Sequence, residues 1–241
     1  NTTCIDLHGR TLMPGINDSH FHPILNGLID LEPDSAIIDT SLKNCSSLSE
    51  LLELIRQAVK RKKEGEWISM MGYEPLHFPE KRHPTLEELD AVAPDNPVHC
   101  MHGGGHICVY NSKALAYLQV YTAEDAKKYP ENEVEVIDGK LTGLVRGHTH
   151  FGLWGKVYYT EEQQIKAAMK SQELCLRKGI TSVGDMGECG KSSYHIMQKL
   201  CSTGRFKIRT YMALHSIFGK EYSKAENAHF LELGFITGLG N

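Results

Sequence analysis

Two histidines separated by one residue, His20 and His22, are the side chains best placed to do chemistry. In an extended strand, residues two apart project from the same face, so both imidazoles can reach one metal ion. With 13 histidines in 241 residues, the H-x-H spacing is expected about 0.7 times by chance. Context favours this pair as metal ligands, because it ends an apolar segment that enters through Pro14-Gly15.

A second copy of the spacing, His148 and His150, follows Arg146-Gly147. The segment resembles an exposed loop, so metal binding is the less favoured interpretation of this pair.

The segment from His102 to His106 encloses three consecutive glycines. A similar His-Gly-Gly-Gly motif forms the oxyanion-hole loop of esterases. That chemistry also needs a G-x-S-x-G motif that carries the nucleophilic serine, and the sequence lacks one. Nucleotide-binding glycine motifs are also missing. We expect the glycines to let the backbone approach a ligand that His106 contacts; a glycine-rich turn with a packed histidine is the alternative.

Asp185 follows a strand predicted over 180–184. A carboxylate there is either an active-site group or, more commonly, the cap of the next helix. Both interpretations stay open.

Hydrophobic periodicity and helix caps predict the elements that position these residues. Capping-box patterns at Ser47, Thr85 and Thr160 each predict the start of a helix. From Thr160 onward helices and strands alternate, which predicts a parallel sheet of either an open doubly wound fold or a (β/α)8 barrel. The predicted strands are 12–18, 67–73, pieces of 98–110, 180–184 and 207–214; further predicted helices are 113–120, 192–201 and 223–233, and 121–140 is predicted to be a loop.

Composition excludes several classes of protein. The net charge of −4, with 41% hydrophobic and 23% charged residues, is typical of a globular protein. No run approaches the roughly 18 apolar residues that span a bilayer, and no long basic block indicates nucleic acid as a partner. Seven scattered cysteines without a C-x-x-C pair, and no targeting pattern, predict a reducing, cytoplasmic location.

Four blocks together resemble the amidohydrolase superfamily, and more narrowly amidohydrolase family 3, the group that includes N-substituted formamide deformylase. The first block is Pro14-Gly15, a strand, the acidic Asp18 and then His20-x-His22. The other three are residues 79–98, 105–115 and 179–183, in matching order and spacing. Many relatives place an acidic residue where Arg146 is followed by Gly147, so the chain departs from the pattern there.

The resemblance implies an α/β fold: a partial (β/α)8 TIM barrel of a metal-dependent hydrolase, with an α/β insertion after the first strand. We expect residues 1–46 to hold the first barrel strand and its loop, 47–150 the insertion, and 151–241 further barrel units. His20 and His22 become the first-strand ligands of a divalent metal, expected to be one or two Zn2+, and His106 a substrate-binding residue. Further His ligands and an Asp are expected after Asn241.

These expectations predict the N-terminal half of an amidohydrolase that cleaves a non-peptide C–N bond with metal-activated water. The chain alone is expected to be inactive. Its partner is predicted to be a small-molecule substrate, without nucleic acid or membrane; the substrate, the metal and the oligomeric state stay open. The alternative is a non-catalytic homologue with a binding or regulatory role.

Overall fold

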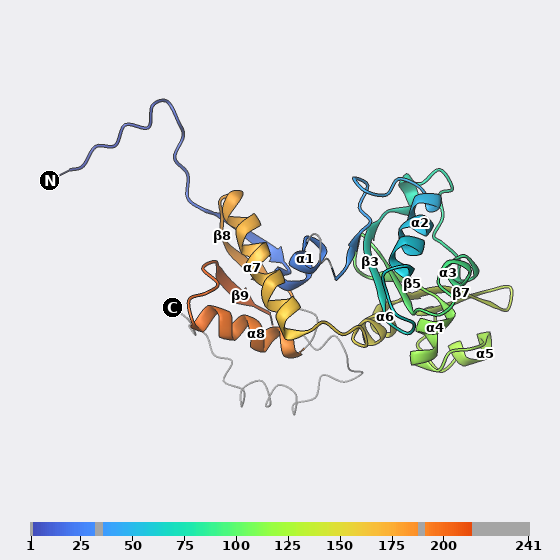
Figure 1. Cartoon of the computed structure of the whole chain (residues 1–241). Coiled ribbons are helices and arrows are strands. Elements are labelled where there is room, and N and C mark those ends of the chain that lie inside the picture. The colour runs from blue at the N-terminus through green and yellow to red at the C-terminus, as the bar shows by residue number, and fades with distance from the viewer. Residues whose placement is uncertain (1, 32–35, 188–190, 214–241) are drawn as a thin grey trace.

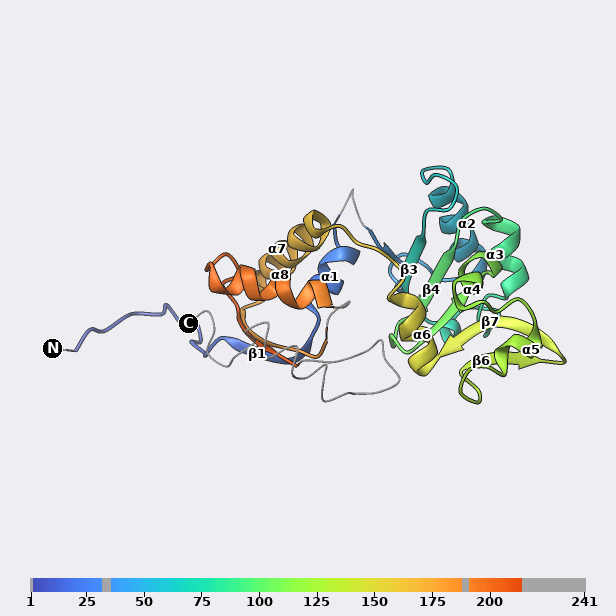
Figure 2. The same ribbon diagram turned by 90° about the horizontal axis from the view of Figure 1, so that it is seen from below.

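The structure, a computed structural model, describes residues 2–31, 36–187 and 191–213. It is mixed α/β with two sheets, one in each of the two lobes visible in Figures 1 and 2. The helix predicted over 223–233 lies outside the described residues. No described helix is long and apolar enough to cross a membrane.

The first sheet contains three parallel strands in the order β1-β8-β9. Helix α7 leads into β8 and α8 connects β8 to β9, as in βα units, and α1 follows β1 and packs on α7 (Figure 1). The Ser171 hydroxyl of α7 donates to the Pro23 carbonyl of α1 at 2.5 Å. The bounds are β1 (Ile16–Phe21), α1 (Pro23–Ile29), α7 (Glu161–Arg177), β8 (Ile180–Asp185), α8 (Lys191–Ser202) and β9 (Arg209–Met212).

Strand β1 lies later in the chain than the strand predicted over 12–18. A strand forms where a partner supplies backbone hydrogen bonds, and the register pairs Ile16 with Ile180, the first residue of β8. The predicted start was therefore wrong, and β1 includes His20. Gly15 lies where the segment before β1 passes close to β8, since a Cβ there would lie 2.1 Å from the Thr181 hydroxyl oxygen.

The second sheet has the order β2-β3-β4-β5-β7-β6. Strands β2, β3 and β4 run parallel, and the remaining neighbours are antiparallel. The bounds are β2 (Ile38–Asp39), β3 (Ile68–Tyr73), β4 (Val98–His102), β5 (Ile107–Tyr110), β6 (Val134–Ile137) and β7 (Lys140–Arg146). The α/β prediction is confirmed, with part of a barrel and an inserted sheet after the first strand.

Helices cover both faces of the second sheet. One buried cluster joins α2 and α3 to the sheet through Leu51, Ile55 and Leu89, and a second includes Cys108, Tyr110 and Trp154. The helices are α2 (Leu48–Val59), α3 (Leu86–Val92), α4 (Ser112–Leu115), α5 (Ala123–Ala126) and α6 (Gly147–Trp154), with short 3-10 turns η1 (Pro75–His77) and η2 (Ala116–Leu118).

Two segments differ from the sequence prediction. The loop predicted over 121–140 contains α5 and β6, because Thr122 forms a capping box with Asp125 and Val134 pairs with β7. The loop predicted around His148 is helix α6. Short elements of this kind lack the periodicity that reveals longer ones.

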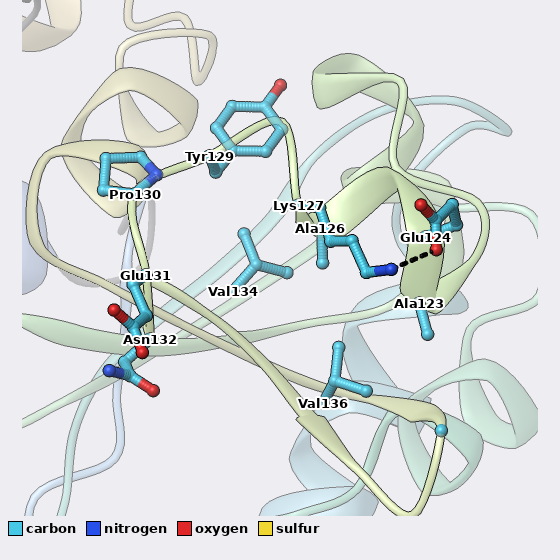
Figure 3. Close-up of a pocket in the computed structure, with 11 residues that line it drawn as sticks. Ala123, Glu124, Ala126, Lys127, Tyr129, Pro130, Glu131, Asn132, Val134 and Val136 are labelled. Atoms are coloured by element: carbon cyan, nitrogen blue, oxygen red, sulfur yellow. Dashed lines mark ion pairs between the residues drawn. The ribbon is translucent and has the colours of Figure 1, made fainter.

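A hollow of about 590 Å³ lies between α5 and β6 (Figure 3). Its wall includes an ion pair between Lys127 and Glu124 at 2.6 Å. The lining residues are Ala123, Glu124, Ala126, Lys127, Tyr129, Pro130, Glu131, Asn132, Val134, Val136 and Gly139. None of the predicted site residues lines it.

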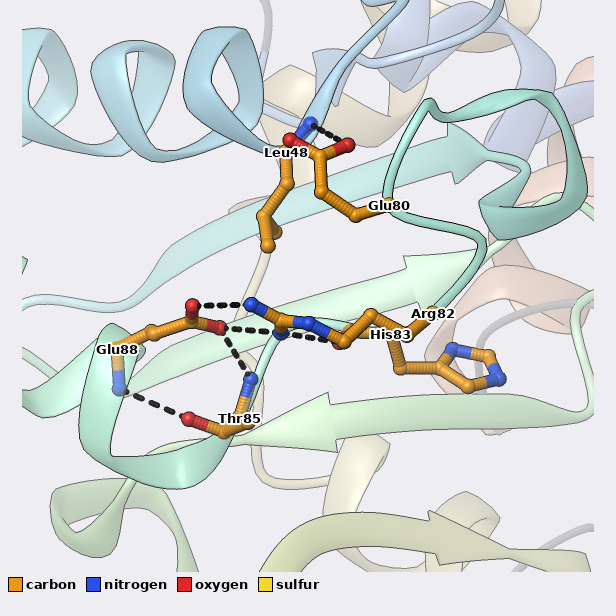
Figure 4. A network of polar contacts seen from close by, with 6 residues as sticks. All are labelled: Leu48, Glu80, Arg82, His83, Thr85 and Glu88. Carbon is orange, nitrogen blue, oxygen red and sulfur yellow. Dashed lines mark hydrogen bonds and ion pairs between the residues drawn. The ribbon is translucent and has the colours of Figure 1, made fainter.

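The block at residues 79–98 is a structural clamp (Figure 4). Both Glu88 oxygens accept hydrogen bonds from Arg82, at 2.7 and 2.8 Å. Glu88 also accepts the Thr85 backbone N–H at 2.9 Å, and the Thr85 hydroxyl accepts the Glu88 N–H at 3.2 Å, so the predicted capping box is confirmed. Glu80 accepts the Leu48 N–H at 3.4 Å, which ties the block to the start of α2.

We expect Glu88→Gln to lower the free energy of unfolding by about 0.5–1 kcal/mol at pH 7, because it removes the charge that pairs with Arg82 while the glutamine oxygen still accepts the Thr85 N–H. The hydrogen bonds from Arg82 hold the pKa of Glu88 below its ordinary value of 4.5, although burial opposes them. This stabilisation is therefore present above pH 4.5 and lost as the pH falls through the folded-state pKa. Denaturant unfolding of the wild type and the variant at pH 7 and pH 3 measures this difference in the free energy of unfolding.

The matched control is Glu87→Gln, an exposed carboxylate in the same helical turn. It should change stability by only a few tenths of a kcal/mol. The stabilising role of Glu88 would be contradicted if the two variants lost the same free energy of unfolding. It would also be contradicted if the loss in Glu88→Gln were as large at pH 3 as at pH 7.

Candidate metal centre

The backbone of His22 is fixed between strand and helix. Pro23 takes the first position of α1 and restricts the residue before it to an extended conformation. His22 has φ −134° and ψ 88°, as expected. Its carbonyl accepts the backbone N–H and the side-chain amide of Asn26, at 3.0 and 2.9 Å. The imidazole is therefore held directly after β1.

The ring of His22 is oriented by a main-chain carbonyl. Its Nδ1 lies 2.7 Å from the carbonyl oxygen of Gly187, and since a carbonyl only accepts, Nδ1 carries the proton and Nε2 keeps a free lone pair. Burial lowers the pKa of His22, the Gly187 carbonyl opposes this, and His20 adds to the lowering. A neutral imidazole with Nδ1 bonded to a carbonyl is the usual state of a metal-ligating histidine.

His20 lies beside His22, and the structure brings the predicted pair together. The ring centroids are 5.2 Å apart with an interplanar angle of 71°. The Asp18 carboxylate accepts the His20 backbone N–H at 3.1 Å, within an irregular part of β1. The His20 ring is exposed and free to turn toward a ligand. Two imidazoles fit a zinc ion as part of the three or more protein ligands it takes.

Asp185 lies at the same end of the first sheet. It is fully buried and aligned in register with Phe21. Its Oδ1 accepts the Gly187 N–H at 3.1 Å, while Oδ2 has no hydrogen-bond partner within the described residues. Burial raises the pKa of Asp185 to about 7. Gly187 thus connects this carboxyl group to His22, which agrees with the active-site interpretation of Asp185.

The glycine-rich segment forms the turn between β4 and β5. The His102 ring accepts the Gly104 N–H through Nδ1 at 2.9 Å, and its Nε2 lies 2.9 Å from the Glu74 carboxylate. His106 is exposed, and its ring contacts Phe151 at a centroid distance of 5.6 Å. Among the described residues, no hydrogen bond or ring contact joins His106 to His20 or His22.

The second H-x-H copy is not a ligand pair, and its segment is not an exposed loop. In a helix, residues two apart point in nearly opposite directions, so in α6 His148 is exposed and His150 is buried. The helix forms here because Glu133 caps it, accepting the backbone N–H groups of His148 and Thr149 at 3.3 and 2.8 Å.

His150 instead joins two residues that sequence reasoning passed over, His99 and Cys108. Their ligand atoms all lie within 4.8 Å of one another. In the β4–β5 ladder His99 is opposite Tyr110 and Met101 is opposite Cys108, so these side chains share one face. The two-residue period in β4 and β5 was the available signal, but it could not reveal that α6 covers this face.

Gly147 lies against Glu133 at the start of α6. Its φ is +62°, and a Cβ there would lie 2.6 Å from the Glu133 carboxylate. Arg146 pairs with Glu135 at 2.8 Å. Both the backbone conformation and the close carboxylate therefore favour glycine at position 147.

The family assignment follows from a comparison with known sequences. The model of the amidohydrolase family matches residues 3–236. The chain belongs to the amidohydrolase family. Its resemblance to family 3 is thereby confirmed.

Several curated proteins are similar to the chain. The N-substituted formamide deformylase of Arthrobacter pascens is 29% identical over 78% of this chain and 35% of its own length. The protein LONG AFTER FAR-RED 3 of Arabidopsis thaliana is 27% identical over 76% of this chain and 30% of its own length. The chain thus spans about a third of these relatives.

Two solved structures share the fold. An uncharacterized metal-dependent hydrolase from Pyrococcus furiosus superposes with a TM-score of 0.53 at 26% identity, covering 84% of this chain and 38% of that one. One from Pyrococcus horikoshii gives a TM-score of 0.54 at 24% identity, covering 84% and 36%.

We expect Gly147→Ala to lower the free energy of unfolding by about 1–3 kcal/mol, because alanine is strained at this φ and its Cβ meets Glu133. Gly152→Ala in the same helix is the matched control, since nothing lies within 4 Å of a Cβ there. That control should be neutral or stabilise by up to about 1 kcal/mol. Thermal unfolding of both variants distinguishes them, and equal behaviour would refute the assigned role of Gly147.

Proposed function

We propose that the protein is a metal-dependent amidohydrolase in which His20 and His22 bind a divalent ion, with Zn2+ as the expected metal. The observation that carries this proposal is the hydrogen bond from His22 Nδ1 to the Gly187 carbonyl, which leaves Nε2 free beside a second imidazole. Family membership and the shared fold with metal-dependent hydrolases support it.

The chemistry divides between the ion and the chain. A bound divalent ion supplies a water-derived nucleophile at neutral pH and polarises a carbonyl group. The chain contributes the orientation of His22 and a buried carboxyl group, Asp185, that can hold a proton near pH 7. Because Asp185 and His22 are both bonded to Gly187, movement of this backbone would shift both groups together.

The proposed substrate is a small molecule with an amide or formamide-like C–N bond outside a peptide. Its support is the similarity to N-substituted formamide deformylase. We propose that His106, exposed at the end of the β4–β5 turn, contacts this substrate from the inserted segment.

The division of the chain into residues 1–46, 47–150 and 151–241 is part of the same proposal, although β2 already contributes to the second sheet. The six described cysteines are free thiols, which supports a reducing, cytoplasmic location.

A regulatory role is the second candidate. It is favoured by similarity to the exoenzymes regulatory protein AepA of Pectobacterium carotovorum, which is 23% identical over 86% of this chain. The two functions differ in whether metal loss abolishes hydrolysis.

We expect His20→Ala and His22→Ala in the full-length protein each to remove bound metal and to lower kcat/KM toward an N-substituted formamide by at least about 100-fold. Elemental analysis and amine release measure the two effects. His195→Ala, an exposed histidine on α8, is the control and should retain both properties.

Full metal content in both ligand variants would overturn the assignment of His20 and His22. A wild-type protein that binds metal but hydrolyses no amide or formamide would favour the regulatory role.

A further inference from the structure

A second group of metal-ligating side chains lies in the interior of the inserted segment. His99 of β4, Cys108 of β5 and His150 of α6 are each fully buried. Their donor atoms lie within 4.8 Å of one another. A tetrahedral zinc ion holds donors at about 2.0–2.3 Å, hence roughly 3.3–3.8 Å apart, so only small side-chain movements separate this arrangement from a coordination shell.

Tyr110 holds the ring of His150. The Tyr110 hydroxyl lies 2.8 Å from Nδ1 of His150 and 3.3 Å from the carbonyl oxygen of the same residue. In the tautomer that binds a metal through Nε2, Nδ1 carries the proton and donates it to the hydroxyl oxygen, while the hydroxyl donates to the carbonyl. Nε2 is buried without a hydrogen bond of normal geometry among the described residues. Burial lowers the pKa of His150 to about 4, and the nearby backbone of Gly105 opposes this.

His99 repeats this arrangement. Its Nδ1 lies 2.8 Å from the Ser69 hydroxyl, and its Nε2 is likewise buried without a hydrogen-bond partner among the described residues. Burial lowers the pKa of His99 well below 6.5, so the ring is neutral and able to act as a ligand. Two buried ring nitrogens without hydrogen-bond partners cost about 1–3 kcal/mol each. An ion that both nitrogens bind removes that cost.

Packing holds both rings in place. The two imidazoles are stacked with centroids 5.9 Å apart and an interplanar angle of 6°. Trp154 stacks on His99 at 5.9 Å and on His150 at 6.1 Å. Metal-ligating histidines usually have such an oriented ring with the second nitrogen bonded to a fixed partner.

We propose that His99, Cys108 and His150 bind one zinc ion that joins the β4–β5 hairpin to α6. A thiolate with two imidazoles is a donor set suited to zinc. Binding forms a zinc–sulfur bond, breaks the Cys108 S–H bond and releases that proton to solvent. The site belongs to the second sheet, whereas His20 and His22 belong to the first.

Cobalt substitution tests the site in the full-length protein, because a thiolate bound to Co2+ gives a sulfur-to-cobalt charge-transfer absorption. The background is the double variant His20→Ala, His22→Ala, so that success or failure of the proposed hydrolase site does not affect the readout. We expect one equivalent of Zn2+ or Co2+ to remain bound, with the charge-transfer band. Adding Cys108→Ser to this background should remove both the charge-transfer band and the bound equivalent of metal.

Two variants serve as controls. Cys100→Ser changes a buried thiol on the opposite face of β4, and Cys201→Ser changes a thiol near Asp185. Both should keep the band. If Cys108→Ser fails to fold, X-ray absorption at the zinc edge of the double variant replaces it, with one sulfur at about 2.3 Å expected. A metal-free double variant, a zinc shell without sulfur, or a band that survives Cys108→Ser would overturn the proposal.

Discussion

The parallel pairing of β1 with β8 is the interaction on which the rest of the structure depends. It places His22 against Gly187, although 165 positions separate them in the sequence. The chain between the two strands must leave the first sheet and return to it, so most of it builds a second sheet with a buried cluster of its own. Loop closure becomes only slightly more costly as a loop lengthens, so a folded insertion of this size is compatible with the pairing.

The same pairing sets the geometry of the candidate metal centre. Gly187 accepts a hydrogen bond from His22 and donates one to Asp185, so one residue of main chain positions two functional side chains. A slip of one residue in the β1–β8 register would turn every side chain of β1 to the other face of the sheet. Pro23 and Asn26 add a second restraint, because they fix the backbone of His22 at the start of α1.

Both groups of histidines in the chain use one physical device. An oxygen atom held by the fold lies within hydrogen-bond distance of Nδ1 of each ring: the Gly187 carbonyl for His22, the Tyr110 hydroxyl for His150 and the Ser69 hydroxyl for His99. This bond fixes the direction in which the opposite nitrogen, Nε2, points. Burial lowers the pKa of each of these rings, which keeps them neutral. Neutral, oriented imidazoles lose little entropy on binding a ligand.

The sequence by itself determined the elements whose signals are local. The caps at Thr85 and Thr160, the long helix that follows Thr160, and the proximity of His20 to His22 all depend on neighbouring residues, and the structure agrees with them. Only the tertiary structure decided where β1 begins, because a strand starts where its partner does. It also decided that His150 lies with His99 and Cys108, since three separate elements supply them. Pairing and packing act between residues far apart in the chain, and no periodicity in one segment records them.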